Sequence, residues 1–257
     1  MTTATTGPPE EAVTEQVAQL EARLEAEHDE LPPTLVHDCV EQARSQFAQA
    51  RIHTFLPILI ERAARAALGR TPLPARSRAT AEHLLTGDLP GRWQHTRGVA
   101  ERAAEVAAIL PREDQPVLLS AAWLHDIGYA PAVADTGLHQ LDGARYLARH
   151  RVPRRVCALV AHHAGAVAVA ELVGLSAELA EFTDEVGPTR DALWYCDMTT
   201  SPDGERVTFD ERMAELRARR GPDDPVVRAL VVNESERAAA VRRTEERLAA
   251  QPKRPWT

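Results

Sequence analysis

Apolar residues recur at intervals of three and four along most of this 257-residue chain, and this spacing constrains the fold more than any other feature. One helical face, for example, carries Val99, Ala103, Val106 and Leu110. From about residue 79 to 200 such patterns follow one another, separated by Pro and Gly. No stretch alternates with a period of two over the length of a sheet strand, although ERVTF at 205–209 is compatible with one short strand. The sequence therefore predicts an all-α fold.

Changes of composition divide the chain into five predicted segments. They are a disordered N-terminus (1–11), a three-helix module (12–69), a linker (70–78), a helical domain (79–250) and a tail (251–257). The N-terminus is Thr, Pro and Glu with nothing to bury, which is typical of disorder. Pro32 and Pro33 separate the first helix of the module from the second. The larger domain is expected to close with helices at about 209–220 and 223–249.

Charge and composition exclude several classes of protein. The net charge of −8 and the isoelectric point near 5.7 argue against a broad basic surface for extended nucleic acid. Lys253 is the only lysine, so the many arginines are interpreted as a compositional bias and given little weight. The N-terminus lacks the features of a signal peptide, and FLPILI is far too short to span a membrane. A cytoplasmic location without membrane contact is expected, with Cys39, Cys157 and Cys196 as reduced core thiols.

Several ionisable side chains fall on apolar helical faces. His95 lies on the stripe of Val99 and Leu110, and His125 follows an apolar run that ends in His125-Asp126. His163 continues the stripe of Val156, Leu159 and Val160, whereas His162 lies about 100° around the helix. Asp197 shares a face with Leu193 and Trp194.

Imidazoles and carboxylates from separate helices have one common reason to converge in an apolar bundle, which is a bound divalent cation. Nitrogen and oxygen ligands without a thiolate favour Fe, Mn, Co, Ni or Mg over a structural zinc site. One or two divalent ions are expected, Fe or Mn before Co, Ni, Mg or Zn.

These motifs resemble a known superfamily. The order His95, His125-Asp126, Asp197, within the strings HTRGVAERA, AAWLHDIGYAP and LHQLDGARYLARH, is similar to the HD-domain superfamily of metal-dependent phosphohydrolases over roughly residues 80–200. A dinuclear subgroup has two more histidines before the last Asp. Their counterparts here are His139 in TGLHQLDGARYL and a histidine in CALVAHHAGA, which helical phase assigns to His163.

The resemblance implies a ligand set. One metal would be held by His95, His125, Asp126 and Asp197, and the other by Asp126, His139 and His163. Asp126 and His125 are the expected catalytic pair, with Asp126 bridging both ions. The stretch ARIHTFLPILIERAARAAL also resembles a three-helix dimerisation module that precedes some actinobacterial phosphatase-type domains, which implies a homodimer through these helices.

Five further residues are candidates around this centre. Arg145, in the helix of His139, is a candidate for a phosphate oxygen, with a solvated surface arginine as the alternative. Asp142 is expected to orient a histidine or a water, or else to be a surface acid. Tyr129 is expected at the pocket mouth, and His162 in the pocket or behind a ligand. Thr199 is expected to contact substrate or to cap a helix.

The leading hypothesis is a hydrolase of a phosphate ester or nucleotide, a dinucleoside polyphosphate among the candidates, acting through metal-activated water. Its partner would be a small nucleotide-like phosphorylated molecule. One alternative is a di-iron oxygenase, because some HD relatives use nearly the same ligands for dioxygen chemistry. The other is a regulatory dimer or scaffold whose metal is structural.

Overall fold

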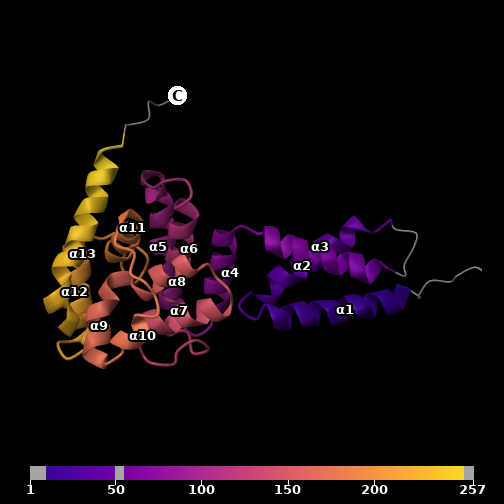
Figure 1. The fold of residues 1–257 in the computed structure, drawn as a ribbon, viewed down its shortest axis with the longest axis horizontal. Helices are drawn as coiled ribbons and strands as arrows, with labels where there is room; N and C mark the ends of the chain where they lie inside the picture. Colours follow the sequence, from indigo (N-terminus) through magenta and orange to yellow (C-terminus); the bar gives the residue numbers. More distant parts are fainter. Residues whose placement is uncertain (1–9, 50–54, 252–257) are drawn as a thin grey trace, which may run out of the picture. The chain divides into compact units, whose positions relative to one another are not determined.

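A computed structural model describes residues 10–49 and 55–251, shown as a ribbon in Figure 1. Most of the predicted disordered N-terminus (1–11) and tail (251–257) lies outside the described residues, as do 50–54 of the third apolar stretch. Residues 10 and 11, expected to be disordered, are helical. The chain falls into two compact units, 1–83 and 84–257.

The described residues are almost all in helices or turns. The first unit contains α1 (Glu10–Glu27), α2 (Pro33–Gln46) and α3 (Leu56–Arg70), and α4 (Leu73–Leu85) crosses the boundary between the units. The second unit contains α5 (Pro90–Val106), η1 (Ala107–Ile109), α6 (Gln115–Leu124), η2 (Ile127–Tyr129), α7 (His139–Arg149), α8 (Arg154–Ala161), η3 (His163–Gly165), α9 (Ala166–Val173), α10 (Ser176–Leu179), α11 (Pro188–Met198), α12 (Phe209–Arg220) and α13 (Pro225–Ala249). The all-α prediction is confirmed. Within the described residues the stretch near 205–209 makes one antiparallel bridge, Thr200 to Arg206, in place of a strand.

Helices α1, α2 and α3 enclose an apolar core. Leu24, Val36, Val40 and Ile60 are each at most 1% exposed. The Pro-rich stretch 70–78, predicted to be a linker, is instead helical from Leu73 onward. Proline is tolerated in the first turn of a helix, where its missing N–H would have no partner, and ARSRATAEHLL then favours helix.

In the second unit α11 lies at the centre and packs on α5, α6 and α13, while α7 packs on α8 (Figure 1). The C-terminal helices are those expected from the sequence. Thr208 and Glu211 form a reciprocal cap at the start of α12, and the Asp224 side chain accepts from the Val226 N–H at the start of α13. These caps fix where α12 and α13 begin, and both helices contribute side chains to the site described below.

One described segment, Arg154–Val173, is long and apolar enough to cross a membrane by length and composition, a stretch longer than the FLPILI singled out above. However, 78% of its apolar window is buried inside the fold. Positive φ angles of 51° at Ala164 and 69° at Gly165 also divide it into α8 and α9. Its apolar character is accounted for by packing in the core.

Candidate metal centre

Helix α5 carries His95 on its buried face. The His95 Nδ1 lies 2.9 Å from the Ser201 carbonyl oxygen, and because a carbonyl only accepts, Nδ1 carries the proton. The loop of Ser201 reaches α5 because Gly98 has no side chain: a Cβ there would lie 2.4 Å from the Gly204 carbonyl oxygen. The Nε2 of His95 faces Asp197 Oδ1 on α11 at 3.1 Å. The lone pair of His95 Nε2 thus faces a carboxylate oxygen of Asp197. Because both atoms are acceptors, a proton or a cation must lie between them.

The His125-Asp126 pair follows directly after α6. The His125 Nδ1 donates to the Ala122 carbonyl oxygen at 2.8 Å. Its Nε2 is buried, has no hydrogen-bond partner among the described residues, and lies 3.4 Å from Asp126 Oδ2. That carboxylate oxygen accepts from Arg92 Nη1 at 2.8 Å. Because a buried nitrogen without a partner is costly, His125 Nε2 is the atom that best fits a metal ligand.

His139 and His163 lie beside the second carboxylate oxygen of Asp126, Oδ1. Helix α7 begins at His139, next to Gly128 of η2, where a Cβ would lie 1.9 Å from the His139 carbonyl oxygen. The His163 Nδ1 donates to the Val160 carbonyl oxygen at 2.6 Å. The Nε2 atoms of the two histidines lie 3.2 Å apart, and 3.4 and 3.7 Å from Asp126 Oδ1. Two nitrogens this close to each other and to a carboxylate also fit a shared cation.

The donor atoms form two groups that share Asp126. The groups are His95, His125 and Asp126, and Asp126, His139 and His163, and within each group the donor atoms lie within 4.8 Å of one another. In three of the four histidines a backbone carbonyl holds the Nδ1 proton, which leaves Nε2 free to bind a metal. This donor chemistry fits a divalent cation on either side of one carboxylate, and the expectation of one or two ions stays a prediction.

Charge keeps the carboxylates of the cluster ionised despite their burial. Burial alone would raise the pKa of Asp126, but His125 and Arg92 hold it well below its usual value. Burial likewise opposes ionisation of Asp197, and the neighbouring His95 and His125 outweigh it, so this pKa is also lowered. Burial lowers the pKa of His95 in spite of the nearby Asp197. Burial would also lower the pKa of His125, but Asp126 raises it. Because ionised carboxylates and neutral imidazoles are the forms that bind divalent metals, metal binding would release the proton of His125.

A comparison with protein-family models matches residues 92–195 to the HD domain. The chain contains an HD domain. The matched region is the domain of a superfamily of metal-dependent phosphohydrolases, and the match supports binding of a divalent metal. The match includes five of the six expected ligands and ends two residues before Asp197. The comparisons with curated proteins and with solved structures found no match.

Tyr129 lies in the cleft of the HD domain, as expected. Its ring stacks on His139 with the ring centroids 3.9 Å apart, and its hydroxyl accepts from Arg220 Nη2 at 2.8 Å. The guanidinium of Arg92 covers the Tyr129 ring at 4.2 Å from the centroid. Tyr129 therefore fixes the orientation of the His139 imidazole between two arginines.

Asp142 neither touches a histidine ring nor lies on the surface as an acid. It is buried, and its carboxylate accepts from the backbone N–H groups of Asp135, Thr136 and Gly137 and from the Thr136 hydroxyl, at 2.6–3.2 Å. These contacts hold the loop that leads into α7. Asp142 thus positions His139 through the backbone rather than by touching its ring.

Three other candidates lie away from the metal-binding cluster. Arg145 pairs with Glu181 on the surface, so the alternative of a solvated arginine holds and the expected phosphate contact does not. The Nε2 of His162 lies 2.7 Å from the Phe182 carbonyl oxygen, a partner outside the cluster. The Thr199 hydroxyl donates to the Tyr195 carbonyl oxygen at 2.7 Å, a bond back into the last turn of α11 rather than a cap of the next turn.

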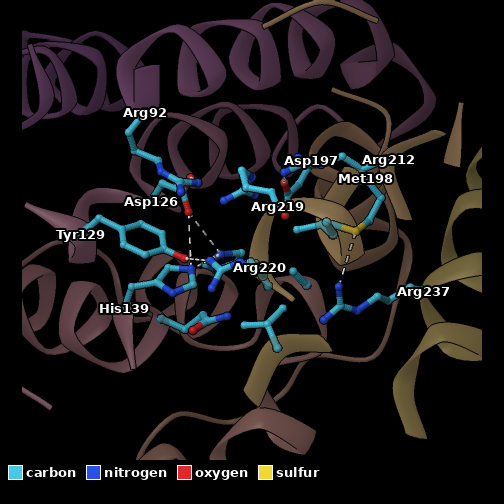
Figure 2. Close-up of a pocket in the computed structure, with 15 residues that line it drawn as sticks. Arg92, Asp126, Tyr129, His139, Asp197, Met198, Arg212, Arg219, Arg220 and Arg237 are labelled. Atoms are coloured by element: carbon cyan, nitrogen blue, oxygen red, sulfur yellow. Dashed lines mark hydrogen bonds and ion pairs between the residues drawn. The ribbon is translucent and has the colours of Figure 1, made fainter. Parts of the chain in front are cut away.

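The sequence interpretation missed the arginines of the cleft. Figure 2 shows side chains from α5, α12 and α13 directed into a cleft beside the cluster. Its arginines are Arg92, Arg212, Arg219, Arg220 and Arg237. They went unnoticed because arginine is frequent throughout the chain. A usable signal existed, since Arg212 and Arg219 lie seven residues apart, on one face of α12.

Proposed function

We propose that this HD domain hydrolyses a phosphate ester or a nucleotide of low molecular weight, a dinucleoside polyphosphate among the candidates. The observation that carries the proposal is Asp126, whose two oxygens face different groups of histidines at the floor of a cleft lined by arginines. A centre with this donor set suits divalent cations, and guanidinium groups suit phosphate oxygens. The two features together favour phosphoryl chemistry.

Each residue of the cluster has an assigned part. One ion would be held by His95, His125, Asp126 and Asp197, and the other by Asp126, His139 and His163. When bound, such ions lower the pKa of water and polarise a phosphoryl oxygen. We propose Fe or Mn as the metal, with Co, Ni, Mg and Zn as alternatives.

The surrounding side chains orient this set. Arg92 donates to Asp126 and keeps that carboxylate ionised and fixed in one rotamer. The carbonyls of Ala122 and Val160 hold the Nδ1 protons of His125 and His163, which directs both Nε2 atoms inward. Tyr129 packs on His139. The protein would thus meet its metals and substrate with little reorganisation.

The test is hydrolysis of p-nitrophenyl phosphate and of a nucleotide panel by protein purified without chelator. Chelation should abolish the activity and added metal should restore it. Asp126→Asn should lower kcat/KM by more than about 100-fold, since even outer partners of metal ligands are worth 10- to 100-fold. Glu171→Gln, on the exposed face of α9, is the control and should leave the rate unchanged. A folded, metal-loaded protein with no activity on the panel would refute the proposal.

The number of ions is tested by metal analysis. Wild type should hold close to two ions per chain and His139→Ala close to one, because His139 belongs only to the second group. Consumption of dioxygen during turnover would favour the di-iron oxygenase. If His95→Ala and Asp126→Ala lowered the melting temperature without affecting any hydrolysis, the centre would be a structural metal in a scaffold.

We also propose that the N-terminal helices form a homodimer. Three large apolar residues at the start of α3 are exposed: Phe55 (61%), Ile58 (64%) and Leu59 (42%). An exposed apolar patch of this kind is typical of an interface. Light scattering should give a dimer for wild type and a monomer for Ile58→Asp. A monomeric wild type would refute this proposal without affecting the metal centre.

A further inference from the structure

Arg237 on α13 is a buried arginine that forms no ion pair with a carboxylate of the residues that the structure describes. Two other arginines of the second unit (84–257), called the HD unit from here on, are nearly as deeply buried, each 4% exposed. Both are neutralised, Arg190 by Asp184 and Glu236, and Arg212 by Glu215. Arg237 is 1% exposed, and in the described part of the chain its guanidinium contacts the Met198 sulfur at 3.8 Å. Its Nε has no hydrogen-bond partner among the described residues, but the same is true of Arg190 and Arg212, so the missing ion pair is what sets Arg237 apart.

Such a group is costly for the fold. Burial of a charge without an ion-pair partner destabilises a protein, and an apolar residue of similar size would serve the packing better. Burial lowers the pKa of Arg237 to about 10 in spite of the nearby negative charge of Asp197, so the side chain is still charged at neutral pH. The charge is therefore retained at a cost that packing alone does not explain.

The fold directs this charge toward the metal cluster. Asn233, one turn before Arg237, donates to the Gly165 carbonyl oxygen at 2.9 Å, which locks α13 onto the turn that carries His163. Gly165 leaves the room for this contact, since a Cβ there would lie 2.6 Å from Asn233 Nδ2 and 3.2 Å from Arg237 Nε. Arg237 consequently lines the same cleft as His163 and Asp197, and Figure 2 shows it pointing into that space.

Positive charge also dominates the neighbouring wall of the cleft. Arg219 and Arg220 of α12 line it, and Arg220 reaches Tyr129 beside the cluster. The carboxylates that line the cleft are Asp126 and Asp197, and both belong to the metal-binding cluster. On the side of α12 and α13 the lining thus offers donors for an anion, and a guanidinium matches phosphate geometry.

We propose that Arg237, with Arg220, binds a second phosphoryl group of the substrate while the first lies at the metals. This inference rests on the proposed function and narrows it to compounds with two or more linked phosphates. The family match ends at residue 195, so the subsite is built by helices outside the matched HD domain and sets the specificity of this chain.

The test uses two hydrolysis-resistant probes, methylphosphonate and methylenediphosphonate, bound by calorimetry to the full metal-loaded chain without excess metal. Wild type should bind the bisphosphonate more tightly. Arg237→Met should reduce this preference by about 10- to 100-fold, the worth of hydrogen bonds to a charged group. The preference of Arg237→Lys for the bisphosphonate should lie between those of wild type and Arg237→Met. The matched control is Arg145→Met, a surface arginine paired with Glu181, which should keep the full preference.

The stability of the variant separates a binding role from a structural one. If Arg237 serves the ligand, Arg237→Met should melt at the same temperature as wild type or higher, because an apolar side chain replaces a buried charge. A lower melting temperature with equal loss of both probes would assign Arg237 to the structure and overturn the inference. An unchanged preference in Arg237→Met would also overturn it, and if the wild type still hydrolysed p-nitrophenyl phosphate, the proposed function would stand.

Discussion

The two units of this chain share the same helical spacing of apolar residues but have different cores. Helices α1 to α3 bury hydrocarbon and keep their charges outside, in exposed pairs such as Arg65 with Glu27. The HD unit buries imidazoles, carboxylates and arginines around one centre. Exposed pairs contribute little, and buried unpaired charges cost much. The first unit is therefore expected to be stabilised mainly by apolar burial, and the second to depend on what it binds.

The largest expected effect is a loss of stability in the first unit alone when its apolar core is disrupted. Leu24 is fully buried in the first unit, so Leu24→Ala should destabilise that unit by about 2–5 kcal/mol through lost burial and a cavity. Scanning calorimetry should show one transition moving down while that of the HD unit stays in place. Gln42→Ala, at an exposed position of α2 outside the proposed interface, is the control and should change little. If both transitions moved together, the units would not be independent.

Removal of metal should lower the stability of the HD unit and leave that of the first unit unchanged. Metal at 100 times its Kd contributes about 2.7 kcal/mol of stability to the fold that binds it. A chelator should therefore lower the melting temperature of the HD unit and expose its amides to hydrogen exchange, above all in α5, α7 and α11. Amides of α1 to α3 should exchange as before. Equal loss of protection in both units would contradict the comparison.

A smaller effect is expected from the loop that precedes α7. Asp142→Ala removes an acceptor from three backbone N–H groups and one hydroxyl, and should cost the HD unit about 2 kcal/mol. Because the loop positions His139, metal content should fall toward one ion per chain. Asp135→Ala, an exposed neighbour, serves as the control. A variant with normal stability and two ions would show that Asp142 is dispensable.

The smallest effect is a pH dependence of the first unit. The hydrogen bond to Glu21, 2.7 Å long, raises the pKa of His37 above its usual value. A raised pKa in the folded state stabilises fully below the unfolded pKa of about 6.5, and this contribution is lost as pH rises through the raised value. The melting temperature of α1 to α3 should thus decrease slightly over that range. His37→Gln should abolish the slope, and an identical slope in this variant would assign it to another group.

The inward ionisable residues could be predicted from sequence because helical phase is local. His95, His125 and His163 each continue an apolar stripe of their own helix, and all three point inward in the structure. Phase also favoured His163 over His162, and the structure brings His163 to Asp126 while His162 contacts Phe182. The assignment of these residues as metal ligands stays a prediction for the metal analysis above.

Other predictions failed because they depended on distant partners. Arg145 lies on the helix of His139 yet faces Glu181, 36 residues away in sequence. Asp142 turned out to be buried because a loop of backbone N–H groups folds over it. The stretch 70–78 looked like a linker because of its prolines, which in fact lie where a helix begins.

The sequence by itself determined the helical class, the starts of the C-terminal helices and the set of ionisable side chains that turn inward, since each follows from spacing within one segment. Only the tertiary structure decided which of those side chains share an oxygen of Asp126 and which arginines face them. Arg237 illustrates the reason: its sequence neighbourhood is that of any amphipathic helix. Its burial without a partner is created by the packing of α13 against the turn of His163, a contact that no local pattern encodes.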